Sequence, residues 1–404
     1  MNRLWHVLPA NERSGLQELS AFLLVFLAGL IRWWPEVHSS CWTPDGTTYQ
    51  AGIDLVLRGT SPYEHSVFPY PPPVAVLGAW ATQLWGGDIF RTLFRYANLL
   101  GGSAAIWGSM AGTRFPSTIR LALGVIGISL LPAVVSGIHN DNLSLLASGT
   151  TIAGLLLWPG NPVLAGACLG FGIALKPIAL PALVLLIAHR PTSSDLRNRL
   201  AGGAAILSAA ALLAPAPGWF IEGLQHPHAL GAADDWATAV MNVSLFRVAS
   251  ALGIKISPFL HLSMILVATF LFARLRSMNP TQVLAVGICC SFLSLPIVWK
   301  HTLLLLTPIP FLAFCSALCS LREKKAEGES ASKKGMARLL LVTLCGLIVI
   351  HANAYGILTL ADDRLNALGI LIPIASLLYL TTFVFTEANV ENIGFEKSTP
   401  RAIP

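Results

Sequence analysis

The chain has 404 residues, of which 54% are hydrophobic and only 11% are charged. An ordinary soluble domain carries about 25% charged residues. Together with a mean hydropathy of +0.66, this composition excludes a soluble globular enzyme, a disordered chain and a nucleic-acid-binding module, and it predicts a polytopic all-α membrane protein. The net charge of +6 is therefore interpreted as a bias of basic residues toward cytoplasmic loops, with no nucleic acid as partner.

Long apolar runs predict about twelve membrane-spanning helices, because one span needs about 20 residues. In chain order the runs are 17–34, 73–90, 95–112, 118–136, 142–158, 163–188, 200–216, 260–276, 281–297, 302–320, 338–358 and 365–385. The sixth run contains Lys176-Pro177, so this span is predicted to be broken. The first run is followed by no small-residue cleavage site and is predicted to be a retained span.

The distribution of basic residues predicts the orientation of the chain. An even number of spans places both termini on one side, and the loops on that side carry most of the Lys and Arg residues, Arg91 and Arg95 among them. The termini are therefore expected in the cytoplasm. The turn between the third and fourth spans also carries arginine, which conflicts with its predicted outer position. The orientation of 91–178 thus stays open, because it inverts if 73–90 is re-entrant or if 163–188 forms two half-helices.

A hydrophilic segment, 321–337, is predicted to be a cytoplasmic basic linker. It divides the chain into a transmembrane catalytic body, 1–320, and a two-helix transmembrane tail, 338–386. A cytoplasmic tail, 387–404, follows.

Two predicted outer loops, 35–72 and 217–259, are long and poor in Lys and Arg. Loops of this length usually carry function. In the first loop, Thr43-Pro44 and Gly59 predict the start and end of a short helix. Its apolar face would hold Tyr49, Ile53, Val56 and Leu57, which predicts an amphipathic helix lying on the outer membrane surface.

Asp45 lies in the first turn of this predicted helix. One interpretation is structural, because an acidic residue there caps the helix or complements its dipole. The other is functional: a carboxylate at the boundary of water and lipid can take a proton from a polar acceptor.

The sequence around Asp45 carries an ordered set of motifs: Asp45, Tyr49-Gln50-Ala51, Leu57-Arg58-Gly59, Ser61-Pro62-Tyr63 and Phe68-Pro69-Tyr70-Pro71-Pro72. Further segments follow in order: Asn140-Asp141-Asn142-Leu143, Leu175-Lys176-Pro177, Asn242-Val243-Ser244-Leu245 and Trp299-Lys300-His301. This series resembles glycosyltransferase family 87, which has the GT-C membrane fold and includes bacterial polyprenyl-phosphate-mannose-dependent α-mannosyltransferases. The series departs from the family at Val243, which replaces a Gln, and after Lys300, where one of two His residues is missing.

The resemblance implies a hexosyltransferase of the bacterial inner membrane with its active site on the extracytoplasmic face. It would transfer a hexose, with mannose expected, from a polyprenyl-phosphate donor to a lipid-linked or cell-envelope glycan, with inversion and without a cofactor. Asp45 would be the general base, with His301 as a second catalytic residue. Positive charge for the leaving phosphate would come from Lys176, Arg247 and Lys300. The expected substrate-binding residues are Tyr49, Tyr63, Tyr70, His139, Asn140 and Asn242.

Structural roles remain open for most of these residues. A lysine inside an apolar run costs about 2.5–3.5 kcal/mol, so Lys176 is expected to face a cavity or a partner. For the basic residues, Lys300 could extend its charged end to the membrane surface, and Arg247 could bind lipid headgroups or pair with Asp234 or Asp235. His301 could bond to backbone, and His139 and Asn140 could cap a helix. Tyr63 could belong to an aromatic belt at the membrane surface. The spacing of His226, His228, Asp234 and Asp235 matches no standard ligand set, so no metal site is predicted.

Two other functions are compatible with the sequence. A transporter or lipid-linked glycan flippase would spread charges through several spans and show repeat symmetry, whereas the intramembrane charge here is nearly confined to Lys176. A glycan ligase or polymerase would share the outer loops and differ in the size of its donor.

Overall fold

The computed structural model describes residues 12–64, 68–111, 117–189, 195–225, 244–254, 256–295, 300–326, 333–350 and 363–395. Every regular element within these ranges is a helix, which confirms the all-α class for the described chain. The elements are α1 (Glu12–Arg32), α2 (Trp34–Val37), α3 (Pro44–Leu57), α4 (Pro72–Trp85), α5 (Gly87–Ala111), α6 (Ser117–Leu130), α7 (Pro132–His139), α8 (Ser144–Leu157), α9 (Pro162–Leu175), η1 (Pro177–Ala179), α10 (Leu180–Ala188), α11 (Asp195–Leu213), α12 (Pro217–Gln225), α14 (Leu245–Ala251), α15 (Pro258–Leu275), α16 (Pro280–Leu293), η2 (Lys300–Leu306), α17 (Pro308–Ala326), α18 (Lys333–Ile350) and α19 (Asp363–Phe395). Each predicted apolar run coincides with one or more of these helices.

Proline and small polar residues divide the apolar sequence into short helices. α9, α15 and α16 each begin with proline, which lacks the N–H group that a first helical residue leaves unpaired. Their N-caps are Asn161, Ser257 and Asn279, and each side chain accepts a backbone N–H of the first turn. Local sequence therefore decides where these helices begin.

The centre of the molecule is built from helices that approach one another at glycine. A Cβ atom on Gly149 of α8 would lie 2.2 Å from the Gly101 carbonyl oxygen of α5, and one on Gly166 of α9 would lie 2.0 Å from the Ala201 carbonyl oxygen of α11. Small residues at helix contacts are typical of membrane bundles, where close backbone packing drives association.

Large apolar side chains cover much of the outer helix surface. Ile31 of α1, Leu207 of α11 and Leu275 of α15 have exposed fractions of 80%, 72% and 80%. Extended apolar surfaces are uncommon on soluble monomers, and they fit the predicted contact with lipid.

Among the described residues, no single helix is both long enough and apolar enough to cross a membrane. Two bent helix pairs meet the same criteria, namely Ser117–Leu130 with Pro132–His139 at 44°, and Leu196–Leu213 with Pro217–Gly223 at 103°.

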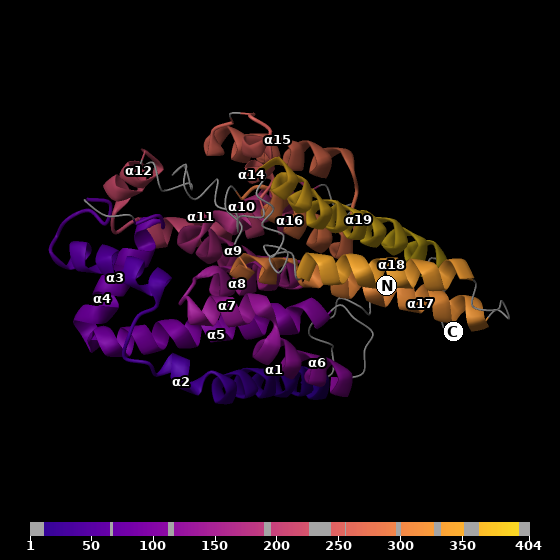
Figure 1. The fold of residues 1–404 in the computed structure, drawn as a ribbon, viewed down its shortest axis with the longest axis horizontal. Coiled ribbons are helices and arrows are strands. Elements are labelled where there is room, and N and C mark those ends of the chain that lie inside the picture. The colour runs from indigo at the N-terminus through magenta and orange to yellow at the C-terminus, as the bar shows by residue number, and fades with distance from the viewer. Residues whose placement is uncertain are drawn as a thin grey trace, which may run out of the picture.

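The second apolar run forms the short helix α4, which returns to the end of the molecule where α3 lies (Figure 1). Its 14 residues span about 21 Å at 1.5 Å per residue, less than the roughly 30 Å hydrocarbon core of a bilayer. α5 then starts beside loop 35–72, because Arg91 Nε and Arg95 Nη1 donate to the Ser39 carbonyl at 3.1 and 2.7 Å. The predicted placement of Arg91 and Arg95 opposite this loop is therefore wrong, because both lie beside it. The re-entrant alternative for 73–90 accounts for the contacts.

The predicted helix of the first loop is present as α3, but its apolar face contacts protein. Tyr49 and Ile53 have no exposed area, and a Cβ atom on Gly78 of α4 would lie 2.5 Å from Ile53 Cδ1. α3 therefore packs on α4, and this part of the helix does not lie against the lipid surface as expected.

α18 and α19 share the main hydrophobic core with the rest of the chain. Val342 and Leu377 are buried in the same cluster as Val25 of α1. The predicted division at 321–337 remains a prediction, because α17 continues as a helix to Ala326 and residues 327–332 lie outside the described ranges.

Candidate active site

Asp45 lies in the first turn of α3 and points toward the turn between α7 and α8. Thr43 occupies the N-cap and Pro44 the first helical position, as predicted. Asp45 is therefore not the capping residue. Its Oδ2 accepts a hydrogen bond from Asn142 Nδ2 at 2.6 Å.

The turn between α7 and α8 directs two consecutive side chains at α3. The N–H groups of Asp141 and Asn142 donate to the carbonyls of Ile138 and Gly137 at 3.2 and 2.9 Å, the pattern of a Schellman helix end. Asp141 has φ +53°, a left-handed conformation that Asp and Asn tolerate better than most other residues. The helix end thereby places a carboxylate and an amide side by side.

A chain of hydrogen bonds connects Asp45 to Lys176. Asn142 Oδ1 accepts the Ser144 N–H at 2.9 Å, and Lys176 Nζ donates to Ser144 Oγ at 2.6 Å. Thr302 Oγ1 lies 3.5 Å from the same Ser144 hydroxyl. A carboxylate, an amide, two hydroxyls and an ammonium group from four segments thus form one polar cluster.

Lys176 reaches this cluster because the helix breaks at its backbone. It is the C-cap of α9 with φ −158° and ψ 120°, and Pro177 opens η1 directly after it. A residue before proline avoids the helical conformation. The predicted break of the sixth span is confirmed, as is the prediction that Lys176 faces a polar partner.

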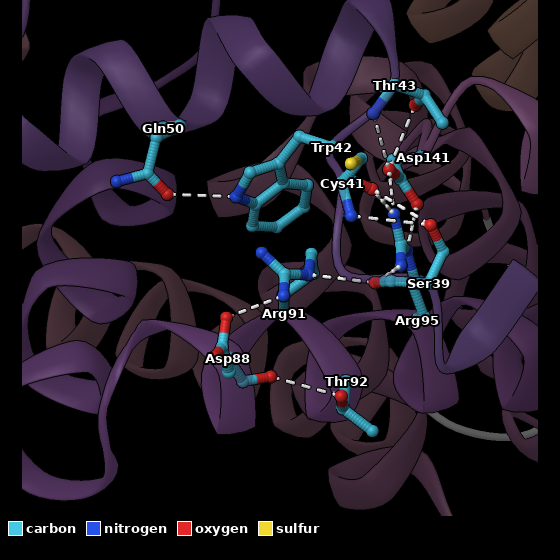
Figure 2. A network of polar contacts seen from close by, with 10 residues as sticks. All are labelled: Ser39, Cys41, Trp42, Thr43, Gln50, Asp88, Arg91, Thr92, Arg95 and Asp141. Atoms are coloured by element: carbon cyan, nitrogen blue, oxygen red, sulfur yellow. Dashed lines mark hydrogen bonds and ion pairs between the residues drawn. The ribbon is translucent and has the colours of Figure 1, made fainter.

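Arg95 and Asp141 form a buried ion pair beside the cluster (Figure 2). Arg95 Nε and Nη2 donate to the two oxygens of Asp141 at 2.6 and 2.8 Å, and the residues are 5% and 2% exposed. Asp141 Oδ2 also accepts the backbone N–H of Thr43 at 3.1 Å and its hydroxyl at 2.9 Å. The Asp45 carboxylate has one described hydrogen-bond donor, Asn142, whereas Asp141 has four.

Burial raises the pKa of Asp45 above its ordinary value of 3.8. The hydrogen bond from Asn142 and the charge of Lys176 oppose this shift, and the charge of Asp141 adds to it. A carboxylate with a raised pKa is a stronger base than an ordinary aspartate once it is ionised.

Tyr49 of α3, Tyr63 and Tyr70 form an aromatic group in which Tyr49 and Tyr63 are buried and Tyr70 is partly buried. The Tyr49 hydroxyl accepts the Leu143 N–H at 3.2 Å, and the rings of Tyr49 and Tyr70 lie 4.6 Å apart. Tyr63 is 4% exposed and donates its hydroxyl to the Tyr70 carbonyl at 2.8 Å. Tyr63 therefore belongs to the packed core, which contradicts its alternative placement in an interfacial belt. Burial raises the pKa of all three phenols, so they remain neutral donors.

His139 and Asn140 point away from Asp45. The His139 side chain is 53% exposed and its Nε2 lies 3.7 Å from Glu36 Oε1. Asn140 Nδ2 donates to the Ser136 carbonyl of its own helix at 2.7 Å. Their predicted substrate-binding role remains a prediction. In the described structure, the polar contacts to Asp45 come from the residues that follow them.

The other predicted residues are placed only in part. Arg247 is 3% exposed on α14, which packs against α19. Asn242 and the side chains of Lys300 and His301 lie outside the described residues, although the backbone of both latter residues begins η2 beside Thr302. The segment 226–235, predicted to bind no metal, also lies outside them. Within the described chain, no group of three or more His, Cys, Asp or Glu residues could hold a metal ion.

Five polar residues near Asp45 are not among the predicted site residues: Arg95, Asp141, Asn142, Ser144 and Thr302. Asp141 and Asn142 belong to the motif Asn140-Asp141-Asn142-Leu143, but local sequence does not predict the left-handed turn that aims them. Arg95 carries no local signal for burial, because its partner Asp141 lies 46 residues away.

No protein-family model matches the chain, and no curated protein matches it. A crystal structure of ArnT from Cupriavidus metallidurans in the apo state is similar with 14% identity and a TM-score of 0.38, covering 95% of this chain and 81% of that chain. A crystal structure of ArnT from the same organism bound to undecaprenyl phosphate is similar with 17% identity and a TM-score of 0.34, covering 97% and 82%. Likenesses this weak establish neither a family nor a shared fold.

Proposed function

We propose that this protein is an integral membrane glycosyltransferase of the GT-C class. It transfers a hexose, with mannose as the first candidate, from a polyprenyl-phosphate donor to a lipid-linked or cell-envelope glycan. One observation carries the proposal: a half-buried carboxylate, Asp45, is joined through Asn142 and Ser144 to the ammonium group of Lys176. The motif series that resembles glycosyltransferase family 87 contains both Asp45 and Lys176 and supplies the substrate class.

In the proposed reaction Asp45 accepts the proton of an acceptor hydroxyl. The freed oxygen attacks the anomeric carbon of the donor, and a new glycosidic bond forms as the bond from that carbon to the phosphate oxygen breaks. The configuration inverts because attack and departure occur on opposite faces. Asn142 holds Oδ2 of the carboxylate at 2.6 Å, which leaves Oδ1 to receive the proton.

The departing group is a lipid phosphate, whose negative charge grows as the bond breaks. A fixed cation stabilises such charge more strongly in a buried site than in water. Lys176 is proposed for this role, with Lys300, Arg247 and His301 as further sources of positive charge or hydrogen bonds. Tyr70 is proposed to form the wall beside the sugar, with the buried Tyr49 and Tyr63 supporting it from the packed core.

The proposed site faces the extracytoplasmic side of a bacterial inner membrane. The supporting observation is that Asp45 lies in loop 35–72, which is rich in aromatic and acidic residues and poor in Lys and Arg. The lipid-held donor would reach the site from the bilayer.

The test is a transfer assay with purified protein in detergent, labelled polyprenyl-phosphate-mannose and an envelope-lipid extract. Asp45→Asn preserves the acceptor atom for Asn142 but cannot take a proton, so transfer should fall by about 10²–10⁴-fold. Asp54→Asn is the matched control: it changes a carboxylate of the same helix that accepts from Gln50 at 2.6 Å, and it should transfer at the wild-type rate.

Each outcome of this assay has a defined meaning. Full activity in Asp45→Asn would exclude Asp45 as the base and move the search to His301. A wild-type protein that is inactive with mannose, glucose and arabinose carriers would refute the transferase proposal, and reconstitution in vesicles would then test the transporter and flippase alternative. Transfer of an assembled glycan but not of one sugar would favour a ligase or polymerase.

A further inference from the structure

Asp141 and Arg95 connect three backbone segments: α5, residues 39–43, and the turn between α7 and α8 (Figure 2). Asp141 binds Thr43, two residues before Asp45, through both the backbone N–H and the hydroxyl. Asp141 directly precedes Asn142, the residue that hydrogen-bonds Asp45. Arg95 holds Asp141 from α5 and also donates to the Ser39 and Cys41 carbonyls at 2.7 and 2.6 Å.

The carboxylate of Asp141 is engaged by two structural partners. Both of its oxygens accept hydrogen bonds from Arg95, and Oδ2 also accepts two from Thr43. Asp141 therefore joins α5 to the start of α3.

The start of α3 is shaped to approach Asp141. A Cβ atom on Gly46 would lie 2.9 Å from Asp141 Oδ2 and 2.3 Å from Trp42 Cε3. Only glycine at this position lets the first turn, with Asp45, lie this close to the carboxylate. The Thr43 side chain makes no hydrogen bond to its own helix, which leaves its hydroxyl for Asp141.

We propose that Asp141, held by Arg95, is a positioning residue for Asp45: it ties the start of α3 to the turn that carries Asn142 and so sets the distance between the proposed base and its hydrogen-bond donor. The inference rests on the proposed transferase function for its kinetic part. Its structural part is independent of any activity.

The left-handed backbone of Asp141 allows a clean test. Glycine and asparagine both tolerate φ +53°, so Asp141→Gly and Asp141→Asn remove the carboxylate without disturbing the helix end. Thr43→Val removes one hydroxyl bond, and Thr43→Ser restores it. Glu18→Gln is the matched control, because Arg120 and Glu18 form another two-pronged ion pair, between α6 and α1.

The first measurement is hydrogen–deuterium exchange of the purified full-length protein by mass spectrometry. In Asp141→Gly, peptides over 42–49 and 141–147 should exchange faster than in the wild type, because the tie between them is gone. The same peptides should be unchanged in Glu18→Gln. Unchanged exchange in Asp141→Gly overturns the inference, whether or not the protein transfers a sugar.

The second measurement is the transfer rate as a function of pH and donor concentration. Displacing a reacting group by about 1 Å can cost about 10²-fold, so Asp141→Gly and Asp141→Asn should lose kcat on this scale with little change in donor KM. Thr43→Val should lose less, and Thr43→Ser should recover the rate.

The acid limb of the profile separates positioning from a general loss of structure. The groups that face Asp45 are Asn142, Lys176, Asp141 and the tyrosines at 49 and 70. Asp141 raises the pKa of Asp45 by charge repulsion, so its neutral variants should move the acid limb to lower pH.

An unchanged kcat and acid limb in folded Asp141→Asn would overturn the inference even if exchange increases. An inactive wild type would refute the proposed function alone, and the exchange result would then decide whether Asp141 positions Asp45.

Discussion

At the scale of single residues, the surroundings of Asp45 set its acidity through opposing effects. Burial raises its pKa from the ordinary value of 3.8, and Asn142 and Lys176 lower it. Because the folded pKa is above the unfolded one, ionising Asp45 costs stability: this contribution favours the folded state at low pH and is lost as pH rises through the raised pKa. The same environment that costs stability at neutral pH makes the carboxylate a better base.

A pH prediction follows for Asn142→Ala. The variant removes the 2.6 Å hydrogen bond to Asp45, and this bond favours the ionised form. The pKa of Asp45 should therefore rise, and the acid limb of the pH–rate profile should move to higher pH, opposite to the shift in Asp141→Asn. Rate profiles of both variants and the wild type check this. Shifts in the same direction would contradict the described hydrogen bond.

At the scale of elements, close backbone contacts hold the helices that carry the site. α9 delivers Lys176 and lies against α11, where a Cβ atom on Gly166 would meet the Ala201 carbonyl at 2.0 Å. α8 begins at Ser144 and lies against α5, the helix of Arg95, through Gly149 and Gly101. The cluster is thus assembled by helices whose spacing depends on glycine.

Gly166→Ala should destabilise the protein, because the added methyl group must push α9 and α11 apart. Inserting a methyl group into a tightly packed contact costs about 1–3 kcal/mol. Gly203→Ala on α11 is the control, since nothing lies within 4 Å of its Cβ position, and helix propensity should make it neutral or stabilising by up to about 1 kcal/mol. Thermal unfolding in detergent measures both. Equal melting temperatures for the two variants would contradict the described contact.

At the scale of the whole molecule, the polar residues of several helices meet at one end. Figure 1 shows α3, α4 and the start of α5 together there, while α17 and α18 lie toward the other end. Arg91 and Arg95 belong to the first group, because both contact the Ser39 carbonyl. This arrangement requires α4 to return to the side from which it entered.

Labelling of cysteines tests this topology. Cys41 is exposed in loop 35–72, and the Asp88 side chain at the start of α5 is 91% exposed. A membrane-impermeant maleimide should label Cys41, and an Asp88→Cys variant in a Cys41→Ser background, from the same side of sealed membranes. Labelling from opposite sides would restore 73–90 as a full crossing.

The amino-acid sequence by itself determined the helical class, the starts of capped helices such as α9, α15 and α16, and the break at Lys176-Pro177. These features depend on apolar runs, prolines and caps that act over a few neighbouring residues. It also indicated Asp45 and Lys176, because a carboxylate beside a helix start and a lysine in an apolar run are conspicuous locally.

Only the tertiary structure decided which residues surround Asp45. Arg95 and Thr43 contact Asp141 across separations of 46 and 98 residues, and no local pattern encodes such pairings. The contacts of Arg91 and Arg95 with the Ser39 carbonyl likewise come from the tertiary structure, because they depend on the path of α4. The physical reason is common to both cases: a buried charge must find its partner in space, and that partner is set by how the helices pack.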